Sequence, residues 1–218
     1  MDADAGACAP FEAAAGEVEL QTDAAKVNTD TGWRDIKVGV YAKREAGEPA
    51  TPAEWDSRRL PGPTARVAFA AIEHCEPFGE KIGDWARRLK VDAGSASVLG
   101  DGAEWIWEQA RKHLPGATQV LDIYHACEHL AEAGRAMYGA GTEGLARWLE
   151  GARRRPLADG WHGVCEAVGE ALAQDNSAPR QAALDEVIGY FSKQTERPSY
   201  CAAVRGPVDR LGDGRGRV

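Results

Sequence analysis

The order in which two hydrophobic periodicities follow each other constrains the fold of this 218-residue chain more than any other feature. Apolar and polar residues first alternate, as in half-buried strands, over residues 17–23, 33–43 and 64–72. Segments with helical spacing of apolar residues then alternate along the chain with short apolar runs. This pattern predicts helices at 77–90 and 103–114 and strands at 95–100 and 118–123. The rest of the chain is helical in pattern, and we expect helices at 124–138, 142–155, 160–174 and 179–195.

Three antiparallel strands followed by strand–helix–strand crossovers form a known type of layout. Each crossover requires parallel strands, because the connection is right-handed and its helix packs back on the sheet. The pattern therefore predicts an α/β fold with a ribonuclease-H-like mixed sheet and a C-terminal helical insertion. The expected parts are a disordered N-terminal extension at 1–16, a ribonuclease-H-like core at 17–123, a helical insertion at 124–197 and a loop-like tail at 198–218.

Composition excludes several classes of protein. The five cysteines are odd in number and form no C-x-x-C pair, which argues against a disulfide framework and a zinc ribbon. No apolar run is long enough to span a membrane, and no signal peptide is evident, so we expect a cytoplasmic protein. The net charge of -8 argues against strong binding to DNA by this chain alone. We interpret the tryptophans, including Trp33 and Trp148, as packing residues rather than base-stacking residues.

Three aspartates lie at the ends of predicted strands: Asp23, Asp101 and Asp122. Ligand sites of open α/β sheets form at the carboxyl ends of parallel strands, so Asp23 and Asp101 are expected to converge there. Converging carboxylates repel, and a hard divalent ion such as Mg²⁺ relieves that repulsion. Two such ions can catalyse phosphoryl transfer. The alternative is structural: Asp23 would be a turn residue and Asp101 an N-cap of the following helix.

A second group of polar residues lies in the segment LDIYHACEHL, which contains Asp122, His125 and His129. The two histidines lie one helical turn apart, a spacing that can hold zinc. No further cluster of ligands accompanies them. We therefore expect Asp122 and His125 to hydrogen-bond to each other or to the wall of the site.

Several segments resemble the ISKra-type insertion-sequence transposases. The matching segments are TGWRDIKVGVYAKRE at 31–45, TPAEW at 51–55, LGDGAEWIW at 99–107 and VLDIYHACEHLAEAG at 120–134. The likeness extends from about residue 17 to residue 206. The family is distantly similar to Mutator-type transposases, in which a C/D-x-x-H motif follows the second catalytic aspartate. Asp122 and His125 match that accessory motif.

The resemblance implies a DDE transposase in which Asp23 and Asp101 are catalytic and bind Mg²⁺ or Mn²⁺. It also implies transposon-end DNA as the partner and the possibility of a homo-oligomer. The chain departs from the family in three ways. Ala24 stands where the family usually has glycine, only sixteen residues precede the first strand, and no I-G-S-G-x-x-E-G segment supplies the catalytic glutamate.

The tail offers an explanation for the missing glutamate. The residues PVDRLGDGRG can be encoded by bases that read RSIGSGMVEG after a shift of one nucleotide, so we expect residues 207–218 to be frameshifted. The expected protein is then a transposase fragment, impaired because its third carboxylate is missing. Two alternatives are a non-catalytic DNA-binding or regulatory remnant, and a metal-dependent nuclease that uses Asp122 as its third carboxylate.

Overall fold

The structure is a computed structural model that describes residues 5–48, 51–54, 57 and 59–197. It divides into two compact units. The first spans Met1–Ala46 and Leu60–Asp122, and the second spans Gly47–Arg59 and Ile123–Val218. The tail at 198–218, with the expected frameshift at 207–218, lies outside the described residues. No helix in the described part of the chain is both long enough and apolar enough to cross a membrane.

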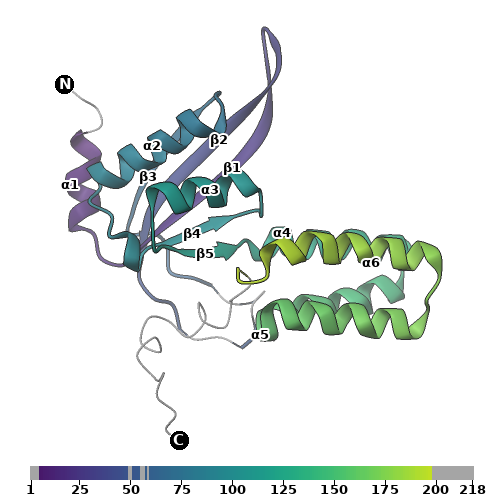
Figure 1. Cartoon of the computed structure of the whole chain (residues 1–218). Coiled ribbons are helices and arrows are strands. Elements are labelled where there is room, and N and C mark those ends of the chain that lie inside the picture. Colours follow the sequence, from purple (N-terminus) through teal and green to yellow (C-terminus); the bar gives the residue numbers. More distant parts are fainter. Residues whose placement is uncertain (1–4, 49–50, 55–56, 58, 198–218) are drawn as a thin grey trace, which may run out of the picture. The chain divides into compact units, whose positions relative to one another are not determined.

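The first unit is built on an open, mixed sheet of five strands in the order β3-β2-β1-β4-β5 (Figure 1). The strands are β1 (Glu17–Thr29), β2 (Gly32–Arg44), β3 (Ala65–Ala71), β4 (Ser97–Gly100) and β5 (Thr118–Leu121). The pairs β1–β2 and β2–β3 are antiparallel, whereas β1–β4 and β4–β5 are parallel. The predicted α/β class, with its antiparallel and parallel halves, is confirmed at this level.

Two helices cover one face of the sheet, α2 (Cys75–Arg88) and α3 (Glu104–His113). Phe78 of α2 and Trp107 of α3 are fully buried in the resulting core. The Tyr41 hydroxyl of β2 donates a hydrogen bond to the Ile82 carbonyl of α2 at 2.9 Å, and burial raises the pKa of Tyr41. The short 3-10 helix η1 (Ala93–Ser95) leads from α2 into β4. The alternation along the strands thus arises because this face is covered.

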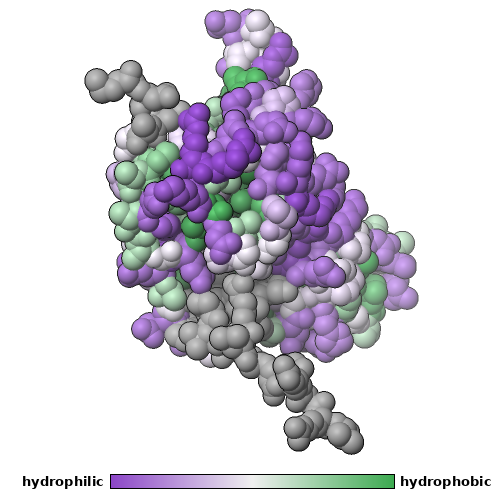
Figure 2. Space-filling model, turned by 60° about the vertical axis from the view of Figure 1, so that its left-hand side comes forward, coloured by the Kyte–Doolittle hydropathy of each residue, from purple (hydrophilic) through white to green (hydrophobic). Residues whose placement is uncertain are grey.

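The β1–β2 hairpin extends beyond its neighbours as a two-stranded arm, which stands out in Figures 1 and 2. β1 pairs with β4 only at residues 19–21, but it pairs with β2 along its whole length. Two expectations are therefore wrong. The first strand does not end at Asp23, because hydrogen bonds to β2 continue the strand to Thr29. Trp33 does not pack in the core, because it lies near the tip of the arm and is 66% exposed.

The N-terminal extension also differs from its prediction. Residues 1–16 were expected to be disordered, but Ala5–Ala13 form the helix α1. Phe11 of this helix is 1% exposed, and its burial supplies the apolar contact that an Ala-rich segment otherwise lacks. The Lys43 side chain donates to the carbonyl oxygens of Glu12 and Ala14 at 3.0 and 2.9 Å. These contacts are distant in sequence, so composition alone did not reveal them.

The second unit is helical. Its elements are α4 (Ile123–Tyr138), α5 (Glu143–Gln174), α6 (Ala178–Phe191) and the 3-10 helix η2 (Ser192–Gln194). The expected helices at 142–155 and 160–174 correspond to two halves of α5, which meet at a kink. The kink lies at Gly160, whose φ of 56° and ψ of -133° suit glycine, rather than at Pro156. Leu130, Val164 and Leu184 are buried where α4, α5 and α6 pack together.

Candidate carboxylate site

The register of the parallel strands places Asp23 and Asp101 at the same level of the sheet. Leu20 of β1 is the Cα partner of Val98 of β4, and Gln21 is the partner of Leu99. Continuing this register by two residues brings Asp23 level with Asp101. Neighbouring strands lie about 4.8 Å apart, so the two residues occupy adjacent positions where β4 ends.

Asp122 is level with Asp101 on the other side of β4. Gly100 is the Cα partner of Leu121, and the Asp122 amide donates to the Gly100 carbonyl at 2.8 Å. The ladder between β4 and β5 therefore continues to this point. Three aspartates stand in one row across β1, β4 and β5, with Asp101 in the middle. We call Asp23, Asp101 and Asp122 the carboxylate row.

Asp101 is held by a tight turn between β4 and α3. Its Oδ1 accepts a hydrogen bond from the Ala103 amide at 2.9 Å, and Gly102 has a φ of +103°. This conformation favours glycine and explains the Asp-Gly pair. The N-cap position itself is Ala103, so Asp101 supports the turn from two residues upstream. A carboxylate has about four lone-pair sites, and the turn bond uses one of them. The structural role is therefore compatible with a ligand role.

Asp23 lies in the middle of β1 and not at its end, opposite Val38 of β2. Its side chain is exposed, and Oδ1 accepts a hydrogen bond from the Ala24 amide at 2.7 Å. The alternative reading of Asp23 as a turn residue is wrong, because the chain stays extended here. Extended backbone also explains the alanine that follows. Ala24 pairs with Lys37 in the ladder and does not take the left-handed conformation that would require glycine.

The charges around Asp23 leave its carboxylate without a cationic partner among the described residues. The nearest lysine in the ladder is Lys37, which pairs with Ala24 and therefore projects to the opposite face of the sheet. Its ammonium donates to the Glu73 carbonyl at 2.7 Å and lies 5.8 Å from the Trp105 ring centroid. Lys26, farther along the arm, pairs with Asp35 at 3.3 Å. A divalent ion is one species that could balance the charge of Asp23.

No group of three or more His, Cys, Asp or Glu side chains is arranged to hold a metal ion within the described part of the chain. A Mg²⁺ ion does not require such a group, because it is often bound by one or two carboxylates and completes its shell with water and phosphate oxygens. Asp23 and Asp101 are the residues that would supply those carboxylates here.

The residues of the accessory motif lie on either side of the boundary between the units. Asp122 ends the first unit, and His125 lies in the first turn of α4 in the second unit. His129, one turn later, stacks on Tyr190 of α6 with ring centroids 3.7 Å apart. This stacking gives His129 a packing role within the second unit. It does not favour the zinc pair that the spacing of the two histidines allowed.

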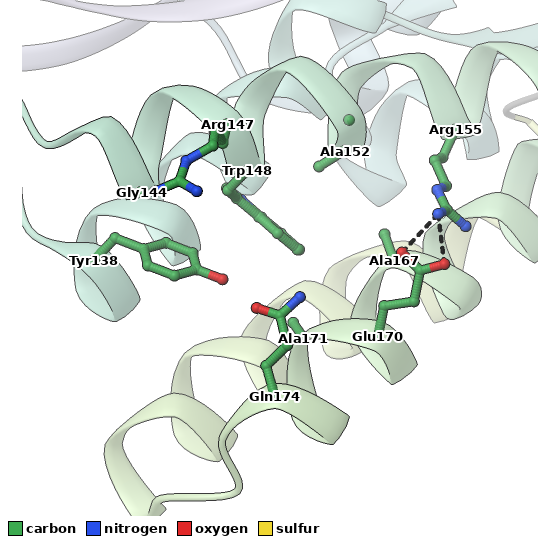
Figure 3. A pocket seen from close by; sticks show the side chains of 11 residues that line it. Tyr138, Gly144, Arg147, Trp148, Ala152, Arg155, Ala167, Glu170, Ala171 and Gln174 are labelled. Carbon is green, nitrogen blue, oxygen red and sulfur yellow. Dashed lines mark hydrogen bonds and ion pairs between the residues drawn. The ribbon is translucent and has the colours of Figure 1, made fainter.

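Sequence reasoning missed a hollow in the second unit, between the two halves of α5 (Figure 3). Arg147 and Trp148 come from the first half, Gln174 comes from the second half, and Tyr138 comes from the end of α4. The tryptophan was expected to pack between helices. Nothing in the sequence indicated a cavity, because it depends on how the chain turns at Gly160.

The fold and the carboxylate row define an α/β protein with an open mixed sheet, in which Asp23 of β1 lies level with the aspartates that follow β4 and β5. No family model matches the chain, and no curated protein matches it either.

Proposed function

We propose that this chain is a DDE-type transposase with a ribonuclease-H-like core, in which Asp23 and Asp101 bind Mg²⁺ or Mn²⁺ and act on transposon-end DNA. The register that brings these two aspartates level on adjacent strands is the observation that carries the proposal. The strand order supports it as well. β1 stands in the centre, with antiparallel β2 on one side and parallel β4 on the other, as expected for this fold.

The chemistry follows from the ligands. The carboxylates of Asp23 and Asp101 would hold the divalent ion through hard oxygen ligands. The metal would supply activation of an attacking oxygen and stabilisation of a leaving oxygen in phosphoryl transfer. The 218 residues contain no I-G-S-G-x-x-E-G segment to supply the third carboxylate. We therefore propose that this chain by itself transfers strands very slowly or not at all, and that it binds metal more weakly than a complete site.

Binding of the metal alone tests the proposal without knowledge of the target DNA. Isothermal titration calorimetry with MnCl₂ should detect binding to the full chain. Asp23→Asn and Asp101→Asn should each weaken it by about tenfold or more, since each removes one of few ligands. Asp92→Asn is a matched control, because Asp92 also accepts a backbone amide two residues ahead, from Gly94 at 3.1 Å. Equal binding by all four proteins would contradict the proposal.

The position of Asp122 favours one further candidate, a metal-dependent nuclease. The ladder from β4 to β5 continues to Asp122, which places this residue level with Asp101. Three carboxylates could then form a complete site without a later glutamate. Nicking of supercoiled plasmid in Mn²⁺ separates the two functions. The nuclease candidate predicts nicking that Asp122→Asn abolishes, whereas the transposase proposal predicts negligible nicking by the parent chain.

A further inference from the structure

We propose that the β1–β2 arm lies along the DNA at Asp23, and that Arg34 binds a backbone phosphate about 13 Å from the level of this aspartate. Arg34 stands four residues before Val38, the Cα partner of Asp23, and a strand rises by about 3.3 Å per residue. Each strand of B-form DNA carries one phosphate per about 3.4 Å of helix axis, so the two contacts are about four phosphates apart. The inference rests on the proposed function and gives it a positioning residue.

The register of the arm places Arg34 on the same face as Asp23. Asp23 is the Cα partner of Val38, and Val27 is the partner of Arg34. Partners that lie directly opposite each other project to the same face, and so do residues two apart along one strand. Asp23, Val27, Arg34 and Val38 therefore share one face of the arm. We call it the carboxylate face.

The helices of the first unit leave the carboxylate face open. On β2, Lys37, Tyr41 and Lys43 interact with α3, α2 and α1 respectively. These residues alternate with Val38, so the three helices lie on the opposite side of the sheet. Val38 is 37% exposed, and Arg34 is exposed as well. A ligand can therefore reach both residues.

The charges of the arm are divided between its two faces. Among strand residues 23–29 and 32–38, all of which the structure describes, Arg34 is the only charged residue on the carboxylate face besides Asp23. Arg34 makes no ion pair with any described residue, and its guanidinium donates to the Thr31 hydroxyl at 3.3 Å. On the opposite face Lys26 and Asp35 pair with each other at 3.3 Å. Arg34 thus has free donors, which are complementary to phosphate oxygens.

The surface between the two charged residues is apolar. Ala25 and Ile36 form a cross-strand pair between the levels of Asp23 and Arg34 on the carboxylate face. A carboxylate at either position would repel a DNA backbone, whereas apolar side chains can contact the C–H groups of deoxyribose. The arm protrudes from the sheet as a two-stranded ribbon (Figure 1), a form that the major groove of DNA admits. Its shape and its charges therefore fit the same ligand.

Fluorescence anisotropy with a labelled, mixed-sequence DNA duplex tests the proposal, because a phosphate contact does not depend on sequence. The net charge of -8 opposes binding by the full chain, so the titrations begin at low salt. Arg34→Gln should weaken binding by about three- to tenfold there. It should also reduce the slope of log K against log salt concentration by about 0.9, the value for one phosphate contact. Arg34→Lys should retain the slope. Lys26→Gln is the matched control, since Lys26 lies on the opposite face and pairs with Asp35.

Three results would overturn the inference: an unchanged slope for Arg34→Gln, an equal loss of slope for Lys26→Gln, or no binding of the duplex by the parent chain at low salt. A dimer in sedimentation velocity that Arg34→Gln dissociates would also overturn it, because the arm would then bind protein.

Titrations in Mn²⁺ and in EDTA at equal ionic strength separate this inference from the proposed function. Mn²⁺ should tighten binding of the duplex by the parent chain and not by Asp101→Asn. If Arg34→Gln lowers the slope but Mn²⁺ has no effect, the proposed function is contradicted and the phosphate contact of Arg34 stands. If Mn²⁺ tightens binding but Arg34→Gln has no effect, the proposed function stands and the role of Arg34 is refuted.

Discussion

Substitution of the central aspartate of the carboxylate row separates a metal-binding role from a structural one. Asp101→Asn removes one negative charge and keeps an oxygen that can accept the Ala103 amide, so the turn into α3 should persist. Asp101 has Asp23 on one side and Asp122 on the other, and therefore two repulsive interactions are relieved. We expect a folded variant that no longer responds to divalent ions.

The expected changes in the free energy of unfolding show that stability must be compared with and without Mg²⁺. Two unit charges about 5–8 Å apart in water repel by about 0.5–0.8 kcal/mol, so relief of two pairs stabilises the metal-free chain by about 1–1.5 kcal/mol at low salt. The N-terminus of α3 favours a nearby carboxylate by about 0.3–1 kcal/mol, which opposes that gain. The net change without metal is thus below about 1 kcal/mol. By contrast, Mg²⁺ at a hundred times its dissociation constant stabilises the parent chain by about 2.7 kcal/mol.

Thermal unfolding of the full chain with and without Mg²⁺ provides the assay. The parent chain and the Asp92→Asn control should gain several degrees, since about 1 kcal/mol corresponds to about 2–4 °C for a chain of this length. Asp101→Asn should gain little or nothing at the same concentration of Mg²⁺. If Asp101→Asn gains as much as the parent chain, or if the parent chain gains nothing, Asp101 has only its role in the turn.

Three further outcomes follow from the first unit. Burial lowers the pKa of His113 below its ordinary value of 6.5, against the opposing charge of Glu80, so the unfolded chain binds the proton more readily. Stability should therefore fall as the pH drops through about 6.5, and urea unfolding of His113→Gln should show a smaller loss; equal losses would contradict this. Phe78→Ala, at a fully buried position, should cost about 3–5 kcal/mol in denaturant unfolding, and a cost below about 1 kcal/mol would refute its core role. Gly102→Ala should lower the free energy of unfolding by about 1–3 kcal/mol, because φ at this position is +103°. Mn²⁺ binding at Asp101 should weaken as well. No change in stability or in Mn²⁺ binding would show that the turn accommodates alanine.

The sequence carried enough information to predict where the five strands lie along the chain. Each strand of the first unit has one covered face, so period-two alternation marks β1, β2 and β3, and short apolar runs mark β4 and β5. The turn at Asp101 was also predictable, since an Asp-Gly pair directly after an apolar run is a local signal. Local signals of this kind report what one segment does by itself or against a single covered face.

The errors occurred where long-range pairing decides the structure. β1 continues past Asp23 as an arm with exposed side chains, so no covered face enforces alternation there and only the partner strand β2 defines its end. Helix α1 depends on the burial of Phe11, a contact distant in the chain. The hollow beside Trp148 depends on the kink at Gly160, and no hydrophobic pattern encodes a space between two helices.

The central claim is that Asp23 and Asp101 share one divalent ion, and paramagnetic broadening by Mn²⁺ tests it most directly. The backbone amides of Ala24 and Gly102 adjoin the two aspartates, whereas Gly32 lies at the tip of the arm, about 20 Å along the strand from Asp23. In NMR spectra of the full chain, the signals of Ala24 and Gly102 should disappear together at the same low Mn²⁺ concentration, while the Gly32 signal persists. Loss of one signal without the other, or of neither, would contradict the account.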